Sequence, residues 1–124
     1  MKRTEMRELA FKTIYSKFFN PSEEEVFANA DQNSLEFTSK ILQNFASHYQ
    51  EINDFLSKKL KGYTIDRINK VDLAILILAV IELKYVKENP KEVVINEAVE
   101  LAKKYSTEKS PKFVNGILAD IVKE

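Results

Sequence analysis

Residues 71–86 read VDLAILILAVIELKYV and form the most hydrophobic segment of the chain. Within this segment, the nine residues from Leu73 to Ile81 are all apolar. A membrane-spanning helix needs about 20 apolar residues, so this run is too short to cross a bilayer. A helix that is apolar on every side is buried inside a protein. We therefore predict a central helix from Val71 to about Val86. The centre of the core should contain four of its residues: Leu76, Ala79, Val80 and Leu83.

The segments before this helix also carry apolar residues at intervals of three and four, which indicates helices. Residues 4–19 predict an amphipathic helix, which ends before a proline because the residue preceding proline avoids helical geometry. A short acidic helix is expected over about residues 21–28. A long helical region should then cover residues 34–60, with Ser34 as its N-terminal cap. Whether this region is one helix or two, with a break near His48, stays open.

The segments around the central helix carry clear stop and start signals. Gly62 suits the left-handed position that follows a helix, and Thr64 can cap a short turn. Residues 94–105 predict another amphipathic helix. Ser110 precedes a proline and therefore predicts the N-terminal cap of the last helix. Because only two glycines and three prolines occur in 124 residues, we predict a single, all-α domain.

The composition argues against catalysis and metal binding. The chain has no cysteine, a single histidine and no glycine-rich phosphate loop. Without thiolates or a second imidazole, His48 lacks the partners of a protein metal site. We therefore expect no metal, no cofactor, no small-molecule substrate and no enzymatic activity. The absence of cysteine and of a hydrophobic leader also predicts a soluble, cytoplasmic protein that does not attach to membranes.

Charge is unevenly distributed, although the formal net charge is zero. Residues 1–19 contain five cationic and two acidic side chains, a net charge of +3. Residues 20–36 contain five acidic side chains and neither lysine nor arginine. A local basic patch can engage phosphate groups even in a neutral protein. The alternative is a solvated surface on which these charges pair with one another.

Two features favour nucleic-acid binding over a purely structural role. Arg3 and Arg7 are four residues apart and therefore share one face of the first helix. Lys112 and Phe113 fall in the first turn of the last helix, where free N–H groups attract phosphate and an aromatic ring can stack on an unpaired base. Phe113 can instead be a core residue, as its periodicity indicates. Gly116 predicts close helix packing, because glycine destabilises a helix by about 1 kcal/mol relative to alanine.

Several runs of sequence together resemble the NusB family of transcription antitermination factors. They are DRINKVD at residues 66–72, VINEAVELAK at residues 94–103 and KFVNGIL at residues 112–118. Near the N-terminus, the pair Ile14-Tyr15 matches the first helix of the family. The match extends in order over essentially the whole chain, although residues 20–60 agree only in helical pattern.

The resemblance implies an all-α fold of two small helical bundles packed together, corresponding to about residues 1–60 and 61–124. It also implies that the protein binds the single-stranded boxA element of nascent ribosomal RNA transcripts. Binding would occur together with the small-subunit ribosomal protein NusE, and the RNA polymerase elongation complex would be an indirect partner. By position, the resemblance assigns RNA binding to Lys2, Arg3, Arg7, Lys112 and Phe113. It assigns NusE binding to Tyr15 and Asp72.

The chain departs from the family pattern where RNA is expected to bind. Thr4 and Glu5 occupy part of an N-terminal arm that is often richer in arginine. Lys109 stands in the loop before the last helix, where the family commonly has an acidic residue, so we add Lys109 to the expected RNA-binding residues. For Asp72 an alternative is a purely structural role, as a favourable charge in the first turn of its helix.

Two other functions stay open at this stage. The same fold forms the RNA-binding domain of certain ribosomal RNA methyltransferases, which continue into a cofactor-binding domain, whereas this chain ends at Glu124. A protein-only helical adaptor without RNA contact is the other alternative. The sequence leaves a monomer and a dimer equally open.

Overall fold

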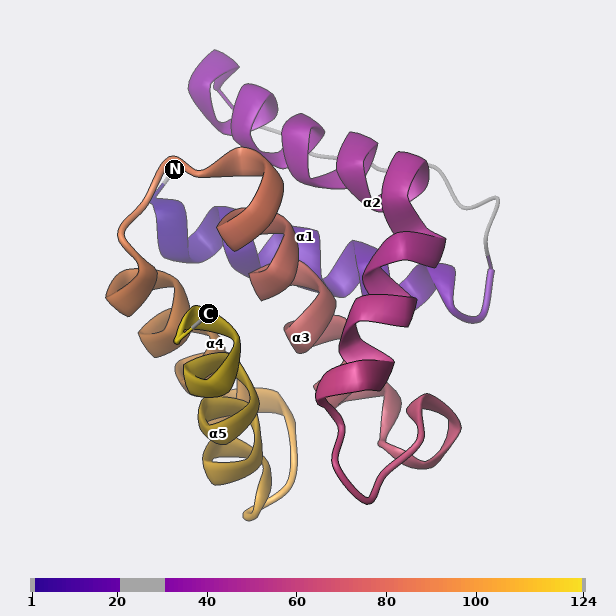
Figure 1. Cartoon of the computed structure of the whole chain (residues 1–124). Helices are drawn as coiled ribbons and strands as arrows, with labels where there is room; N and C mark the ends of the chain where they lie inside the picture. The colour runs from indigo at the N-terminus through magenta and orange to yellow at the C-terminus, as the bar shows by residue number, and fades with distance from the viewer. Residues whose placement is uncertain (1, 21–30, 124) are drawn as a thin grey trace.

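The computed structural model describes residues 2–20 and 31–123, and in these residues it contains helices and no strand. The expected all-α fold is therefore confirmed (Figure 1). The expected acidic helix over residues 21–28 lies outside the described residues. The α-helices of the described part are α1 (Arg3–Lys17), α2 (Gln32–Lys59), α3 (Lys70–Ile81), α4 (Lys91–Tyr105) and α5 (Ser110–Val122). A 3-10 turn, η1 (Ile65–Arg67), precedes α3, and a π-helical segment, η2 (Glu82–Val86), continues it.

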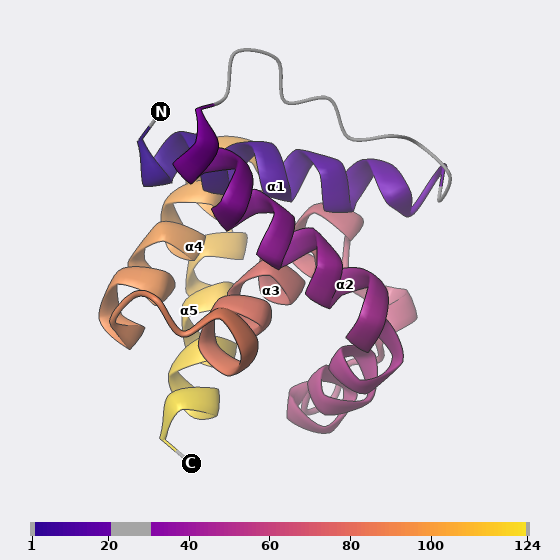
Figure 2. The same ribbon diagram turned by 90° about the horizontal axis from the view of Figure 1, so that it is seen from above.

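Helix α3 is the centre of the fold, as its sequence predicts. Every residue from Asp72 to Ile81 is buried, and α3 packs against α1, α2, α4 and α5 (Figures 1 and 2). The expected halves of the chain therefore meet at this helix. Within the described residues, no helix combines the length and the apolar character that a bilayer crossing requires.

One of the four residues expected at the centre of the core lies elsewhere. Leu76, Ala79 and Val80 are buried, but Leu83 is only half-buried at the edge of the core. The helix widens into a π-turn after Ile81, and the N–H of Lys87 donates to the carbonyl of Glu82 at 2.9 Å. This wider turn rotates Leu83 away from the position that regular α-helical spacing predicts.

Helix α2 consists of two helical segments that meet at a kink at His48, which answers the question left open by the sequence. His48 has non-helical angles, with φ −122° and ψ 18°, and Figure 1 shows α2 bending near its middle around α3. The His48 ring stacks on Tyr85 of η2, with centroids 4.3 Å apart. The predicted cap is wrong, because Asp31 accepts the N–H of Ser34 at 2.8 Å and Ser34 itself is buried.

Helices α4 and α5 form a pair that packs on α3. Ser110 was expected to cap α5, but Lys109 occupies the capping position and makes no side-chain cap bond. The Ser110 hydroxyl instead donates to Asp72 of α3 at 3.0 Å. Gly62 has the expected left-handed geometry, with φ +80°. Thr64 precedes η1, but its side chain makes no cap hydrogen bond.

Candidate nucleic-acid interface

The first turn of α5 places Phe113 partly in the core and partly at the surface. Phe113 is half-buried against the hydrophobic cluster, and its ring meets Tyr63 edge to face with centroids 5.5 Å apart. Tyr63 lies in the loop between α2 and η1 and is 55% exposed. The left-handed Gly62 lets the chain turn immediately before Tyr63. Phe113 therefore packs partly in the core and also borders the surface, where its ring is in reach of a ligand.

A hollow of about 180 Å³ lies on one side of this aromatic pair. It brings together three residues that the sequence singled out, Asp72, Lys109 and Phe113. Arg67 of η1, which the sequence did not single out, also lines it. Both Arg67 and Lys109 are exposed, so cationic groups border a hollow with an aromatic wall.

A second hollow, of about 390 Å³, shares the Tyr63–Phe113 pair as part of its lining. Its cationic residues include Lys61 and Lys112, both of which are exposed. Gly116 also lines it, and a Cβ atom added there would meet nothing within 4 Å. The expectation of close helix packing at Gly116 is therefore wrong, because the glycine faces open space.

The two hollows together offer what single-stranded nucleic acid requires. Cationic side chains neutralise phosphates, and exposed aromatic rings stack on unpaired bases. The sequence did not identify Tyr63, Lys61 and Arg67 as binding residues. Gly62 predicts a turn at this point, but it does not predict which helix the loop packs against. Only the packing of this loop against α5 brings these residues to Phe113.

Asp72 is 6% exposed and lies at the start of α3, in the lining of the smaller hollow. Its carboxylate accepts hydrogen bonds from the hydroxyls of Ser106 at 2.6 Å and Ser110 at 3.0 Å. It also accepts from the Asn69 amide at 3.0 Å, and the N–H of Asp72 donates to the Asn69 side chain at 2.7 Å. These bonds fix the loop before α5 to the start of α3, a structural connection that the sequence did not predict.

The N-terminal cationic residues occupy a separate part of the surface. Lys2 is exposed at the start of α1. The Arg3 guanidinium lies 4.0 Å above the Phe37 ring centroid and donates to Glu88 at 3.1 Å. Hydrogen bonding from Lys40 is the main cause that lowers the pKa of Glu88, and Arg3 adds to it. The N-terminal end of α1 and the start of α5 lie apart in Figure 1, so the structure does not join these two sets of cations.

Arg7 shares the helix face of Arg3, as expected, but it is only 2% exposed. Its guanidinium donates to both carboxylate oxygens of Glu82, at 2.7 and 3.0 Å, and lies 3.7 Å from Glu97. Burial raises the pKa of Glu82, although the hydrogen bonds from Arg7 act in the opposite direction. In this arrangement the Arg7 guanidinium binds carboxylates inside the protein and is not presented to solvent phosphate.

Tyr15, the other expected partner contact, belongs to an aromatic patch near the end of α1. Tyr15 is half-buried, and its ring meets Phe19 edge to face with centroids 5.2 Å apart. Phe19 is 66% exposed. The patch therefore presents a large apolar surface beside a tyrosine, a combination that is common in protein interfaces.

Residues 4–123 match the model of the NusB family. The chain belongs to the NusB family. Among similar proteins, the transcription antitermination protein NusB of Finegoldia magna is 41% identical, over 99% of this chain and 95% of the relative. The protein of the same name from Listeria innocua is 37% identical, over 100% of this chain and 98% of its own length.

Solved structures agree with this NusB family assignment. T. maritima NusB superimposes with a TM-score of 0.93 at 34% identity, covering 100% of this chain and 92% of that one. A structure described as antitermination factors NusB and NusE in complex with dsRNA gives a TM-score of 0.86 at 31% identity. That match covers 99% of this chain and 98% of the matched one.

Proposed function

We propose that this chain is a cytoplasmic transcription antitermination factor that acts by binding and not by catalysis. It holds boxA-type RNA of nascent ribosomal RNA transcripts together with the ribosomal protein NusE, and through them acts on RNA polymerase. The observation that supports RNA binding best is the Tyr63–Phe113 pair, which lies between two hollows lined by cationic residues. The family assignment and the solved NusB–NusE complex with RNA support the choice of partners.

In this proposal the interface at α5 provides stacking and phosphate contacts in one place. Phe113 stacks on an unpaired base, and Lys109 and Lys112 neutralise phosphates on the two sides of the ring. Lys61 and Arg67 extend the same track across the loop before α3. The aromatic residues that line the two hollows are Tyr63 and Phe113, so we expect tight binding only when NusE is present.

The N-terminal arm contributes a second, weaker set of phosphate contacts through Lys2 and Arg3. Arg3 is one-third exposed and can exchange its bond with Glu88 for a phosphate. Arg7 has a positioning role, because its buried bonds to Glu82 fix α1 to η2 and so hold Lys2 and Arg3 in place.

NusE binding is assigned to the aromatic patch at the end of α1, where Tyr15 and the exposed Phe19 lie together. Asp72 contributes by holding the loop before α5 through Ser106 and Ser110. Calorimetry of Tyr15→Ala against NusE tests the direct contact. Unchanged affinity in a folded Tyr15→Ala variant would remove Tyr15 from the interface.

The decisive experiment measures fluorescence anisotropy of a labelled boxA RNA, with and without NusE. Phe113→Leu should weaken binding and leave its salt dependence nearly unchanged, because stacking releases no counterions. Lys112→Gln should reduce the slope of log affinity against log salt by about 0.7. Phe18→Leu is the matched control, because Phe18 is also half-buried but lies at the end of α1 and lines neither of the two hollows. If RNA affinity survives both test variants, the RNA site lies elsewhere on the surface. If the wild-type protein binds no boxA RNA with or without NusE, the protein-only adaptor becomes the better account.

A further inference from the structure

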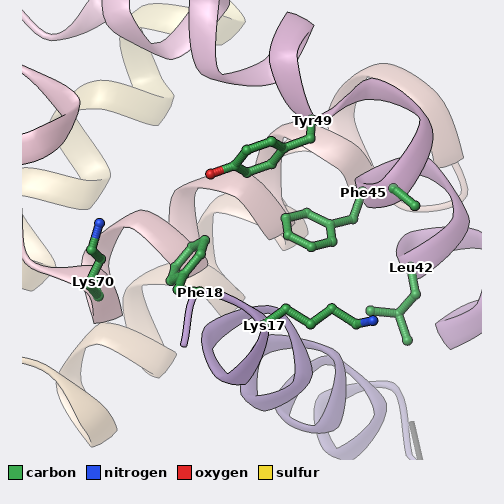
Figure 3. A pocket seen from close by; sticks show the side chains of 7 residues that line it. Lys17, Phe18, Leu42, Phe45, Tyr49 and Lys70 are labelled. Carbon is green, nitrogen blue, oxygen red and sulfur yellow. The ribbon is translucent and has the colours of Figure 1, made fainter. Parts of the chain in front are cut away.

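A third hollow, separate from the α5 interface, lies between the end of α1, the middle of α2 and the start of α3. Its volume is about 430 Å³. Three aromatic side chains, Phe18, Phe45 and Tyr49, form most of its wall, as Figure 3 shows. Leu42, Ala46 and two cationic side chains, Lys17 and Lys70, also line it. None of the functions proposed above uses this hollow.

The kink of α2 shapes the apolar wall. His48, where the helix bends, lies between Phe45 and Tyr49 in the sequence. The rings of Phe45 and Tyr49 meet edge to face, with centroids 5.3 Å apart and planes at 76°. Phe45 is 8% exposed, whereas Tyr49 is 39% exposed. The wall is therefore a corner between rings and not a flat platform, and it fits a compact apolar side chain better than a stacked base.

The charge of the hollow is positive. Among the described residues that line it, none is acidic, and no acidic side chain of the described part pairs with Lys70. The Lys70 ammonium lies 5.6 Å from the Phe18 ring centroid. Figure 3 shows the ammonium groups of Lys70 and Lys17 on opposite sides of the three rings. A ligand that complements the three rings and Lys70 carries negative charge beside an apolar group.

We propose that this hollow docks a short acidic segment of a partner protein, with a leucine or phenylalanine side chain held against Phe18, Phe45 and Tyr49. A carboxylate beside that anchor pairs with Lys70. An apolar anchor in a pocket surrounded by charged pairs is a common form of peptide recognition. A second copy of this chain is a poorer occupant, because an isologous contact would bring the same lysines close to each other.

The test is a ¹H–¹⁵N NMR titration of the full chain with the peptide acetyl-EELFEE-amide. Three matched peptides serve as controls: QQLFQQ removes the charge, EEAAEE removes the apolar anchor and KKLFKK reverses the charge. We expect EELFEE to shift the amide signals around Phe18, Phe45 and Tyr49, and each control peptide to bind at least about tenfold more weakly.

Variants locate the binding on the protein. Lys70→Glu should weaken EELFEE by about tenfold or more, whereas Lys58→Glu, an exposed lysine elsewhere on α2, should leave it unchanged. Tyr49→Ala should weaken the peptide, whereas Tyr63→Ala should not. Because Lys70 and Tyr49 are exposed, both variants should fold, which the NMR spectrum itself verifies.

Three results would overturn the proposal. The first is the absence of shifts at millimolar EELFEE, or equal binding of KKLFKK. The second is a single-stranded RNA that shifts the same signals more strongly than the peptide, which would make the hollow part of the RNA track. The third is a concentration-dependent dimer in sedimentation velocity that Tyr49→Ala abolishes, which would make a second copy the occupant.

Discussion

The rings of Tyr63 and Phe113 meet edge to face at 5.5 Å and join the loop after α2 to the first turn of α5. This contact places an exposed ring beside a half-buried one, with cationic residues on both sides. The half-buried ring fixes the position of the exposed ring, so that stacking on a base costs little additional ordering. In the proposed RNA site, Phe113 therefore belongs both to the core and to the binding surface.

Tyr63 should contribute directly to RNA affinity. Tyr63→Ala removes an exposed ring, so we expect binding of boxA RNA with NusE to weaken by about 1–3 kcal/mol. Thermal stability should change little, because the side chain is 55% exposed. Tyr63→Phe is the matched control, since it keeps the ring and loses only the hydroxyl. Equal affinities of all three proteins would exclude Tyr63 from the RNA site.

Gly116 should be replaceable with a gain in stability. Alanine is favoured over glycine within a helix by about 1 kcal/mol, and an added Cβ would meet nothing within 4 Å. We expect Gly116→Ala to raise the midpoint of thermal unfolding. If RNA approaches α5 closely through the hollow beside Phe113, the same variant should bind RNA more weakly. A lower midpoint would show that Gly116 is under a steric restraint that its surroundings do not reveal.

The helices could be predicted from the sequence because their signals are local. The apolar run of α3, the spacing of apolar residues in α4 and the left-handed Gly62 each depend on a few neighbouring residues. The predicted caps failed for a related reason. Asp31 and Ser34 are both good capping residues within one turn, and local sequence does not show which one the core buries.

The candidate site was less predictable, because its residues come from distant parts of the chain. Arg7 looks like an exposed cation on α1, and only the fold brings Glu82 of η2 to its guanidinium. Tyr63 follows a turn glycine, and only packing brings it to α5. The family resemblance assigned Phe113 to RNA binding and Asp72 to NusE binding, but it could not supply the serine hydroxyls that hold Asp72.

Truncating a fully buried leucine should cost more stability than truncating a half-buried one. Leu76→Ala leaves a cavity in the centre of α3 and should destabilise the protein by about 2–5 kcal/mol. Leu83→Ala should cost clearly less, because the π-turn moves this side chain to the edge of the core. Urea unfolding of both variants measures the difference. Equal losses would contradict the position of Leu83 in η2.

Arg7 should stabilise the fold through its ion pair with Glu82, and the free energy lost on its removal should depend on pH. Arg7→Met leaves Glu82 buried without its ion pair and should destabilise the fold by about 3–5 kcal/mol at neutral pH. A carboxyl group whose folded-state pKa lies above its unfolded value costs stability when it is ionised. The cost is absent below the ordinary value of 4.5 and grows as the pH rises through the folded pKa.

Without Arg7, the pKa of Glu82 should rise further, so the stability lost by Arg7→Met should be larger at pH 7 than near pH 4.5. Urea unfolding at both values measures this loss relative to wild type. The double variant Arg7→Met/Glu82→Leu is the control, and it should recover stability and lose the pH dependence of the difference. A loss that is independent of pH would mean that it does not come from ionised Glu82 left without its ion pair.

Asp72 should affect binding through the loop that it holds. Its carboxylate accepts from Ser106, Ser110 and Asn69, and Asp72→Asn replaces one accepting oxygen by a donor, so at least one of these groups loses its acceptor. We expect a loss of about 1–3 kcal/mol in stability. RNA affinity should fall as well, because Lys109 and Phe113 follow the same loop.

Ser106→Ala separates this indirect role from a direct contact with NusE. It removes one hydrogen bond to Asp72 but leaves the carboxylate and its charge in place. If Asp72 acts through the loop, Ser106→Ala and Asp72→Asn should weaken NusE and RNA binding in proportion to their losses of thermal stability. If Asp72 contacts NusE itself, calorimetry should show lost NusE affinity in Asp72→Asn alone. Because the Asp72 side chain is only 6% exposed, we expect that it acts through the loop and that both variants lose affinity in proportion to their stability.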